Sequence, residues 1–78
     1  MTRSSRNDDR RTPAERIIAE VWTEVLGVGP IGVGNNFFRL GGDSIHSIHV
    51  VAKARERGLE LTPQMIFQYD TLAELAAA

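Results

Sequence analysis

The sequence predicts an all-α fold, a small four-helix bundle with three longer helices, one short third helix and a long ordered loop between helices one and two. The first observation is that no stretch alternates apolar and polar residues with the period of two that a half-buried strand shows. The second is that apolar residues recur at helical spacing in segments that begin with helix-capping residues. The third is the length of 78 residues, which fits a single domain whose small core supports only marginal stability.

The first helix is predicted to begin after Thr12, which stands at the N-cap. Pro13 takes the first helical position, and Glu15 stands where its side chain can close a capping box. An apolar stripe follows at helical spacing, and Trp22 within it is expected to be mostly buried. The stripe consists of Ile17, Ile18, Val21, Trp22 and Val25. The opposite face carries Arg16, Ala19, Glu20, Thr23 and Glu24. Gly27 is a suitable stop.

A segment rich in glycine, residues 27–43, separates the first two helices. It holds six of the seven glycines together with Pro30, so a continuous helix is not expected. Its apolar residues predict an ordered loop that is pinned to the core, and Asn36 is expected to cap a single helical turn through the following FFRL. These apolar residues are Val28, Ile31, Val33, Phe37, Phe38 and Leu40. Ordered loops of this length tend to carry function.

The second helix is predicted from about Ser44 to Arg57, with Gly58 as its stop. Its expected core stripe consists of Ile45, Ile48, Val51 and Ala52, widened by Val50 and Ala54. Its expected polar face consists of His46, His49, Lys53, Glu56 and Arg57. A short third helix, LTPQMIFQY, is capped by Thr62 with Pro63 first. The fourth, TLAELAAA, begins with Thr71 and Glu74, which are expected to form a second capping box.

Composition and charge exclude several classes of function. The chain has no cysteine, which excludes disulfides, thiolate metal ligands and thiol chemistry. The net charge of −1 gives no general attraction to nucleic acid or to an anionic membrane. No apolar run reaches transmembrane length and no signal peptide is visible, so a soluble cytoplasmic protein, or a fragment of one, is expected. Residues 1–11 are polar, and we expect a disordered leader or linker there, ahead of one domain over 12–78.

Asp43 and Ser44, at the start of the second helix, are the strongest candidates for a functional site. Both residue types are favoured as helix caps, which is one interpretation. The other is that Ser44 is an attachment point: Gly41 and Gly42 leave the approach free of side chains, and a helix N-terminus favours a phosphate-bearing group. A catalytic serine is not expected, because it needs a base within hydrogen-bond reach and the only histidines are expected to point away.

Other segments are weaker candidates. His46 and His49 alone make an incomplete metal site. The glycine-rich GVGPIGVG lacks the Lys-Ser/Thr ending and the preceding strand of a phosphate-binding loop. Met65, Ile66 and Phe67 are consecutive apolar residues on a short helix, so at least one is expected to contact solvent or a partner. An unmodified helical module that binds protein or nucleic acid remains an alternative function.

The segment NNFFRLGGDSIHSIHVVAKARERGLELTPQMIFQYDTLAELA resembles the peptidyl carrier (thiolation) domains of nonribosomal peptide synthetases, and the resemblance covers residues 13–77. It implies a non-catalytic domain with 4′-phosphopantetheine attached to Ser44 by a separate phosphopantetheinyl transferase. The arm would carry aminoacyl or peptidyl groups as thioesters to adenylation, condensation, and epimerization or thioesterase domains. No metal is implied.

The same resemblance assigns roles to the residues around Ser44. Gly41, Gly42 and Asp43 correspond to the modification motif. The surface that partner domains contact is expected to include Phe38, Ile45, Met65 and Ile66. The residues on either side of Ser44 resemble carriers that precede epimerization domains. Asp70 departs from the family pattern, which often has proline there, so a looser turn before the last helix is expected. The excised domain is expected to be monomeric.

Overall fold

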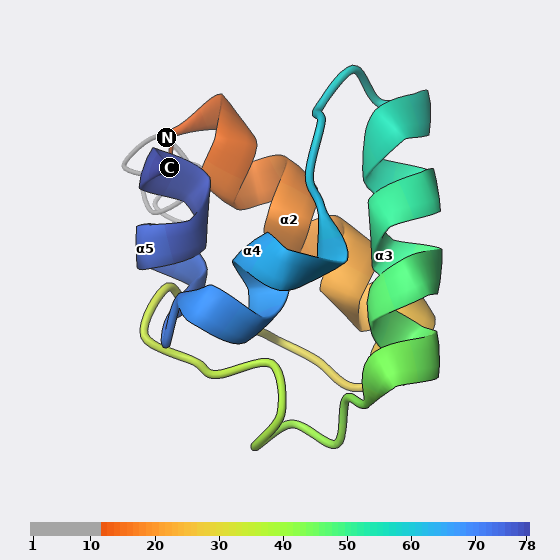
Figure 1. Cartoon of the computed structure of the whole chain (residues 1–78). Helices are drawn as coiled ribbons and strands as arrows, with labels where there is room; N and C mark the ends of the chain where they lie inside the picture. Colours follow the sequence, from red (N-terminus) through yellow and green to blue (C-terminus); the bar gives the residue numbers. More distant parts are fainter. Residues whose placement is uncertain (1–11) are drawn as a thin grey trace.

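The computed structural model describes residues 12–78 and contains four helices and no strand in that range (Figure 1). The helices are α2 (Pro13–Leu26), α3 (Ser44–Glu56), α4 (Pro63–Gln68) and α5 (Leu72–Ala77). The predicted all-α four-helix fold is therefore confirmed. The leader expected at residues 1–11 lies outside the described residues. No helix within 12–78 is both long enough and apolar enough to cross a bilayer.

The predicted proportions of the helices were wrong in one respect. Helices α2 and α3 have 14 and 13 residues, whereas α4 and α5 have 6 each. The last helix is therefore as short as the third in the described residues. The bundle consists of two long helices and two short ones, and α2 packs against both α3 and α5.

Helix α2 begins as predicted. The Thr12 hydroxyl accepts a hydrogen bond from Glu15 N at 3.1 Å, and the Glu15 carboxylate accepts one from Thr12 N at 2.9 Å. This closed capping box satisfies two of the amides that a helix start leaves without partners. Gly27 ends the helix in the left-handed conformation, with φ of 69°. One placement was wrong: Ala19 is buried at 5 % exposure rather than on the polar face.

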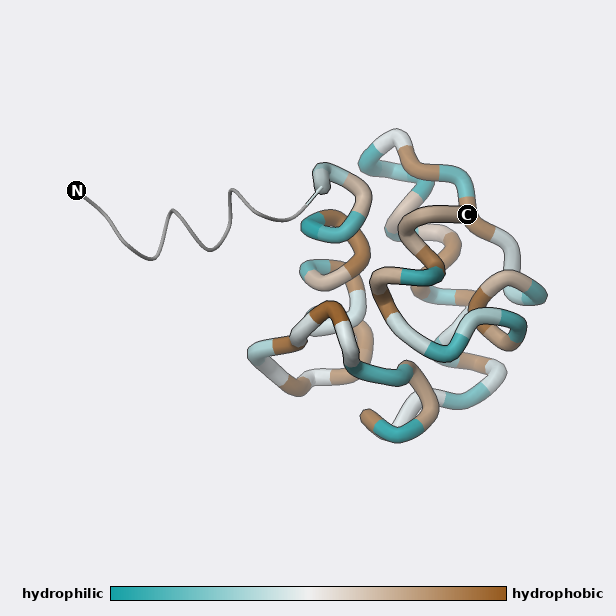
Figure 2. Tube along the Cα trace, turned by 90° about the vertical axis from the view of Figure 1, so that its left-hand side faces the viewer, coloured by the Kyte–Doolittle hydropathy of each residue, from teal (hydrophilic) through white to brown (hydrophobic). Residues whose placement is uncertain are grey.

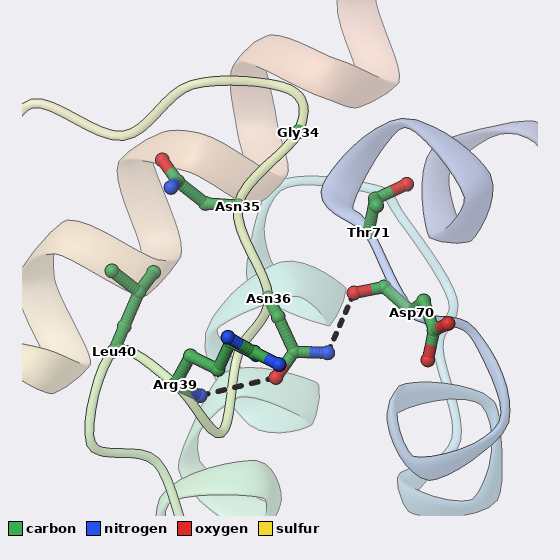
Figure 3. Close-up of a pocket in the computed structure, with 7 residues that line it drawn as sticks. All are labelled: Gly34, Asn35, Asn36, Arg39, Leu40, Asp70 and Thr71. Carbon is green, nitrogen blue, oxygen red and sulfur yellow. Dashed lines mark hydrogen bonds between the residues drawn. The ribbon is translucent and has the colours of Figure 1, made fainter.

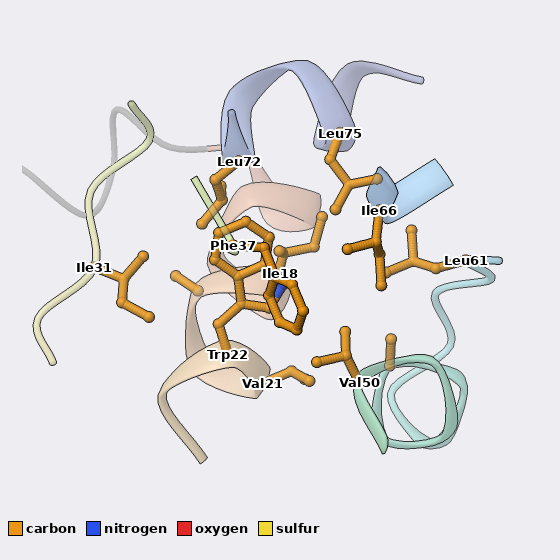
Figure 4. Close-up of a cluster of buried hydrophobic side chains, with 12 residues drawn as sticks. Ile18, Val21, Trp22, Ile31, Phe37, Val50, Leu61, Ile66, Leu72 and Leu75 are labelled. Atoms are coloured by element: carbon orange, nitrogen blue, oxygen red, sulfur yellow. The ribbon is translucent and has the colours of Figure 1, made fainter. Parts of the chain in front are cut away.

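The core surrounds an aromatic pair, Trp22 from α2 and Phe37 from the loop (Figure 4). Their ring centroids are 5.2 Å apart at an angle of 56°, and each side chain is 2 % exposed. The burial predicted for Trp22 is confirmed. The other buried apolar residues come from every helix and from both long connections: Ile18, Ala19, Val21, Ile31, Val50, Ala54, Leu61, Ile66, Leu72 and Leu75.

Helix α3 turns to the core a face that matches the predicted one only in part: Val50 and Ala54 are buried and Val51 packs against the core, as expected. Ser47, Val50 and Ala54 are buried, whereas Ile45 and Ile48 are 65 % and 59 % exposed. Small side chains allow α3 to lie close to the rest of the bundle, and the only buried hydroxyl among them is satisfied, because Ser47 Oγ donates to Ser44 O at 2.7 Å. The two large isoleucines are therefore left on the surface.

The loop over residues 27–43 is ordered and partly buried. Figure 2 shows hydrophobic residues in brown along this connection as well as along the helices. Ile31 and Phe37 are buried, and Val28 and Leu40 pack against the core. Two of the six apolar residues expected to pin the loop do not do so: Val33 and Phe38 are 38 % and 36 % exposed.

The loop is also hydrogen-bonded to the start of α5. Leu72 N donates to Asn35 O at 3.0 Å, and Ala73 N donates to Val33 O at 2.9 Å. Two amides at the start of this short helix therefore find their acceptors in a segment that lies more than thirty residues earlier in the sequence. The loop that leads to Ser44 and the last helix are held together as one unit.

Candidate functional site

Ser44 is the first residue of α3, and its neighbour Asp43 is the N-cap. The Asp43 carboxylate accepts a hydrogen bond from His46 N at 2.9 Å. The Ser44 side chain is exposed, and its hydroxyl makes no hydrogen bond with any residue in the described range 12–78. Asp43 therefore takes the capping role, and the Ser44 hydroxyl remains available as the attachment point that the sequence also suggested.

Hydrogen bonding stabilises the negative charge of the Asp43 carboxylate, which lies next to Ser44 in the sequence. The backbone N–H of His46 holds the pKa of the Asp43 carboxyl below its usual value of 3.8, and the His46 ring lowers this pKa further. His46 Nδ1 lies 2.9 Å from Asp43 Oδ1. This approach is an ion pair when the imidazole is protonated, because Nδ1 makes no hydrogen bond within residues 12–78. Neither histidine is placed as a base for Ser44 by any hydrogen bond in the described range, and no three metal-binding side chains cluster there.

The glycine pair before Asp43 has two separate structural requirements. Gly41 has φ of +102°, a conformation that L-residues rarely adopt. Gly42 has no such φ, but a Cβ on it would lie 2.4 Å from Phe37 Cε2. Backbone bonds from Gly41 N to Phe38 O and from Gly42 N to Phe37 O, both 3.1 Å, fold this turn back on itself. The sequence alone indicated only that the pair leaves the approach open.

Asn36 organises the turn that precedes the glycines. Its Oδ1 accepts hydrogen bonds from Phe38 N at 2.9 Å and Arg39 N at 3.0 Å, so the predicted capped turn is confirmed. Its Nδ2 donates to Asp70 O at 2.6 Å. One side chain thus caps the turn and also fastens it to the α4–α5 connection.

Asp70, the residue that departs from the pattern of the resembled family, takes part in the hydrogen bonds of the turn before α5. Asp70 N donates to Glu74 Oε1 at 3.0 Å, and Thr71 Oγ1 accepts from Glu74 N at 3.1 Å. The predicted capping box was therefore half wrong, because the Glu74 carboxylate bonds Asp70 N instead of Thr71 N. Proline at position 70 would lack this N–H donor. These hydrogen bonds hold the turn in place, which argues against the looser turn expected there.

Exposed hydrophobic side chains form an aromatic pair and a helix face near the site. Phe38 and Phe67 stack with centroids 5.1 Å apart and an angle of 14° between their rings. Ile45 and Ile48 are exposed on α3. Ile66, predicted for a partner surface, is 1 % exposed and belongs to the core, since α4 turns it inward.

Met65 and Phe67 flank the buried Ile66 on α4. Met65 is partly buried against the core, and Phe67 is 51 % exposed. The sequence contained a signal for Phe67, because three consecutive apolar residues on one helical turn cannot all face inward. That signal did not identify which residue would be exposed.

A polar hollow of about 370 Å³ lies between the loop and the start of α5 (Figure 3). Its lining residues are Gly34, Asn35, Asn36, Arg39, Leu40, Asp70 and Thr71. Figure 3 shows Asn36 and Arg39 of the loop on one side and Asp70 and Thr71 on the other. The sequence did not predict this hollow, because its two sides are brought together only by the fold.

Within residues 12–78, the arrangement presents one free hydroxyl at a helix N-terminus, and no hydrogen bond places a base beside it. A family model described as "Phosphopantetheine attachment site" matches residues 16–78. A curated relative, a linear gramicidin synthase of Brevibacillus parabrevis, is 56% identical over 68 residues, which cover 87% of this chain. The match covers only 1% of that relative, so this chain corresponds to a very small part of a much longer protein.

Solved structures give the same picture. A structure of a nonribosomal PCP domain is 38% identical, with a TM-score of 0.83 and coverage of 87% of this chain and 88% of that one. A structure of the phosphopantetheine transferase Sfp in complex with coenzyme A and a peptidyl carrier protein gives 37% identity and a TM-score of 0.75. That match covers 86% of this chain and 88% of that chain.

Proposed function

Because this chain belongs to the phosphopantetheine attachment site family, as a non-catalytic peptidyl carrier domain with a covalent 4′-phosphopantetheine, we propose that Ser44 is the residue to which this arm is joined. The observation that carries the proposal is the free, exposed hydroxyl of Ser44 at the first position of α3. When bound, the arm supplies a thiol that holds an aminoacyl or peptidyl group as a thioester.

The surroundings of Ser44 fit a phosphodiester. The dipole of the 13-residue helix α3 favours negative charge at its N-terminus. Asp43 takes the amide of His46, which keeps the helix start ordered without using the Ser44 hydroxyl. Gly41 and Gly42 add no side chains to the approach. The chain therefore presents the hydroxyl, and the base for its transfer has to come from a separate transferase.

We further propose that partner domains dock on the exposed apolar side chains near Ser44. Phe38 and Phe67 form a preorganised aromatic pair, and Ile45 and Ile48 extend from α3. Small apolar patches with polar surroundings suit weak, successive contacts. The proposed partners are the phosphopantetheinyl transferase and the adenylation, condensation and epimerization or thioesterase domains of a nonribosomal peptide synthetase, acting in the cytoplasm.

The motif GGDSI supports a position before an epimerization domain. Asp43, its distinctive residue, is exposed and holds its negative charge through the bond to His46 N. A downstream domain can therefore recognise this carboxylate directly beside the arm. Asp43→Asn tests the assignment, because it removes the charge but keeps a capping oxygen; the expected result is loss of epimerization with unchanged loading by the adenylation domain.

The test of attachment is the intact mass of the apo protein after incubation with coenzyme A and a broadly specific transferase. The expected result is a gain of one phosphopantetheine, and Ser44→Ala should abolish it. Ser47→Ala is the matched control: Ser47 is buried at 1 % exposure, so its hydroxyl is inaccessible and this variant should still gain the mass. No gain in the wild type, or a gain that survives Ser44→Ala, would contradict the proposal.

The alternative of a nucleic-acid-binding helix is weakened by ion pairing on α3. Arg57 pairs with Glu20 and Glu24 of α2, and Lys53 Nζ lies 3.6 Å from Glu24 Oε1. These cations are therefore partly neutralised within the domain. A DNA affinity that falls steeply with added salt would favour the alternative, since such a slope reports phosphate contacts.

A further inference from the structure

We propose that the phosphopantetheine arm on Ser44 has a resting place on its own carrier, in the polar hollow between the loop and the start of α5, with Arg39 as its main contact. The inference rests on the proposed attachment at Ser44. The hollow has a volume of about 370 Å³ and is partly open to solvent, and Figure 3 shows the residues that line it.

The unused hydrogen-bonding groups of the hollow match the chemistry of the arm. Arg39 is exposed and makes no ion pair with any residue from 12 to 78. Asn35 uses its Oδ1 to accept from Gly32 N at 2.6 Å, which leaves its amide N–H groups available as donors. Thr71 Oγ1 accepts from Glu74 N and keeps its own hydrogen to donate.

The serine-linked 4′-phosphopantetheine arm offers the complementary groups. It has two amide carbonyls and a phosphodiester as acceptors, two amide N–H groups and a hydroxyl as donors, and a geminal dimethyl group as an apolar element. Arg39 and Asn35 can donate to the acceptors, and the Asp70 carboxylate can accept from the donors. Leu40 provides an apolar wall for the methyl groups.

The fold brings the hollow within reach of Ser44. Gly42 N is bonded to Phe37 O at 3.1 Å, and Phe37 directly follows Asn36, which lines the hollow. Ser44 is the fourth residue after Leu40, which lines the hollow, and each extended residue spans at most about 3.6 Å, so the Cα atoms of Leu40 and Ser44 are within roughly 14 Å. An arm built from phosphate, pantoate, β-alanine and cysteamine units is long enough to return along this turn.

Attachment makes even a weak contact sufficient. A group tethered by a short flexible arm has an effective concentration in the millimolar range at nearby sites. The hollow is open and its contacts are polar and solvated, so partner domains can still withdraw the arm. The consequence is a carrier that keeps the arm close to its own loop between visits to partner domains.

The experiment compares ¹⁵N,¹³C-labelled apo and holo protein by NMR, with conversion verified by intact mass. The expected result is a set of NOEs from the arm's geminal methyl groups to the methyl groups of Leu40 and Thr71. Shifts of Arg39 Nε–H and of the Asn35 side-chain amide should accompany them. Shifts confined to residues 43–46, with no NOE to the hollow, would overturn the inference.

A pair of charge-removing variants tests the role of Arg39. Arg39→Gln should weaken or abolish these NOEs while the holo form is still produced. Arg55→Gln is the matched control, because Arg55 is also exposed but lies on α3 outside the hollow. Equal NOE intensities in the two variants would overturn the role of Arg39. No mass gain in the wild type would overturn the proposed attachment, and with it this inference.

Discussion

The ring of Phe37 occupies the space in which any residue other than glycine at position 42 would place its Cβ. A Cβ on Gly42 would lie 2.4, 2.6 and 2.7 Å from three carbons of this ring. The ring cannot easily move away, because Phe37 is 2 % exposed and packs against Trp22. The turn that presents Ser44 is therefore built directly onto the hydrophobic core.

We expect Gly42→Ala to lower the free energy of unfolding by about 1–3 kcal/mol, the usual cost of forcing extra volume into a packed site. Gly34→Ala is the matched control, since a Cβ on Gly34 would meet no atom within 4 Å beyond its chain neighbours, and Gly34 has no positive φ. Its effect should be neutral or stabilising by up to about 1 kcal/mol. Urea unfolding measures both, and equal stabilities would show that the Phe37 ring can yield.

Trp22 has a buried indole Nε1 without a hydrogen-bond partner among the described residues. Trp22→Ala should cost roughly 3–5 kcal/mol. Because small domains have only about 5–15 kcal/mol of stability or less, much of this variant should be unfolded. Trp22→Phe keeps an aromatic ring and removes the unpaired donor, so a smaller cost of about 1–2 kcal/mol is expected. Thermal unfolding followed by circular dichroism measures both, and equal losses would contradict the packing described for Phe37.

Asp43 should make stability depend on pH at the acidic end. Its pKa is lowered in the folded protein, chiefly by the hydrogen bond from His46 N. The carboxylate's contribution is therefore fully present above the ordinary pKa of 3.8 and is lost as the pH falls through the lowered value. Asp43→Asn retains a capping oxygen that does not titrate. The stability difference between wild type and Asp43→Asn should thus change below about pH 4 in favour of the variant, as measured by urea unfolding; a constant difference would contradict this coupling.

Local signals in the sequence predicted much of the fold. Thr12, Pro13 and Glu15 specify the start of α2 through contacts within four residues, and the structure forms all of them. Asn36 likewise caps a turn made by the residues that follow it at once. The burial of Trp22 followed from its size and its place in a helical stripe. These features depend on nearest neighbours, and spacing along the chain is enough to infer them.

Features that depend on packing between distant segments were not predictable in the same way. The core face of α3 was misplaced in part because Ile45 and Ile48 are the more apolar choice, whereas the fold buries Ser47 beside the expected Val50 and Ala54. The clash that fixes Gly42 depends on where the loop folds. The hollow depends on hydrogen bonds between the loop and α5. None of these contacts can be predicted from the periodicity of apolar residues in the sequence.

Ile66 and Phe67, adjacent on α4, should separate stability from partner binding. Ile66 is 1 % exposed, so Ile66→Ala should cost about 2–5 kcal/mol. Phe67 is 51 % exposed, so Phe67→Ala should change stability much less and should mainly raise the KM of the transferase for the carrier. Urea unfolding and steady-state kinetics with the transferase provide the two measurements. An unaltered KM for Phe67→Ala would remove Phe67 from the docking surface for this partner.

Asn36 joins the turn before Ser44 to the α4–α5 connection, and its two functions can be separated by two variants. Asn36→Asp keeps the oxygen that accepts from Phe38 N and Arg39 N but loses the donor to Asp70 O. Asn36→Ala loses all three bonds. Since a typical hydrogen bond contributes about 0.5–1.5 kcal/mol, the loss of three bonds in Ala should cost about 1.5–4.5 kcal/mol, and Asp should cost less. Amide hydrogen exchange should show faster exchange at Phe38 and Arg39 in the Ala variant only. Faster exchange at these two amides in the Asp variant as well would mean that the bond to Asp70 O, rather than the cap itself, holds the turn in place.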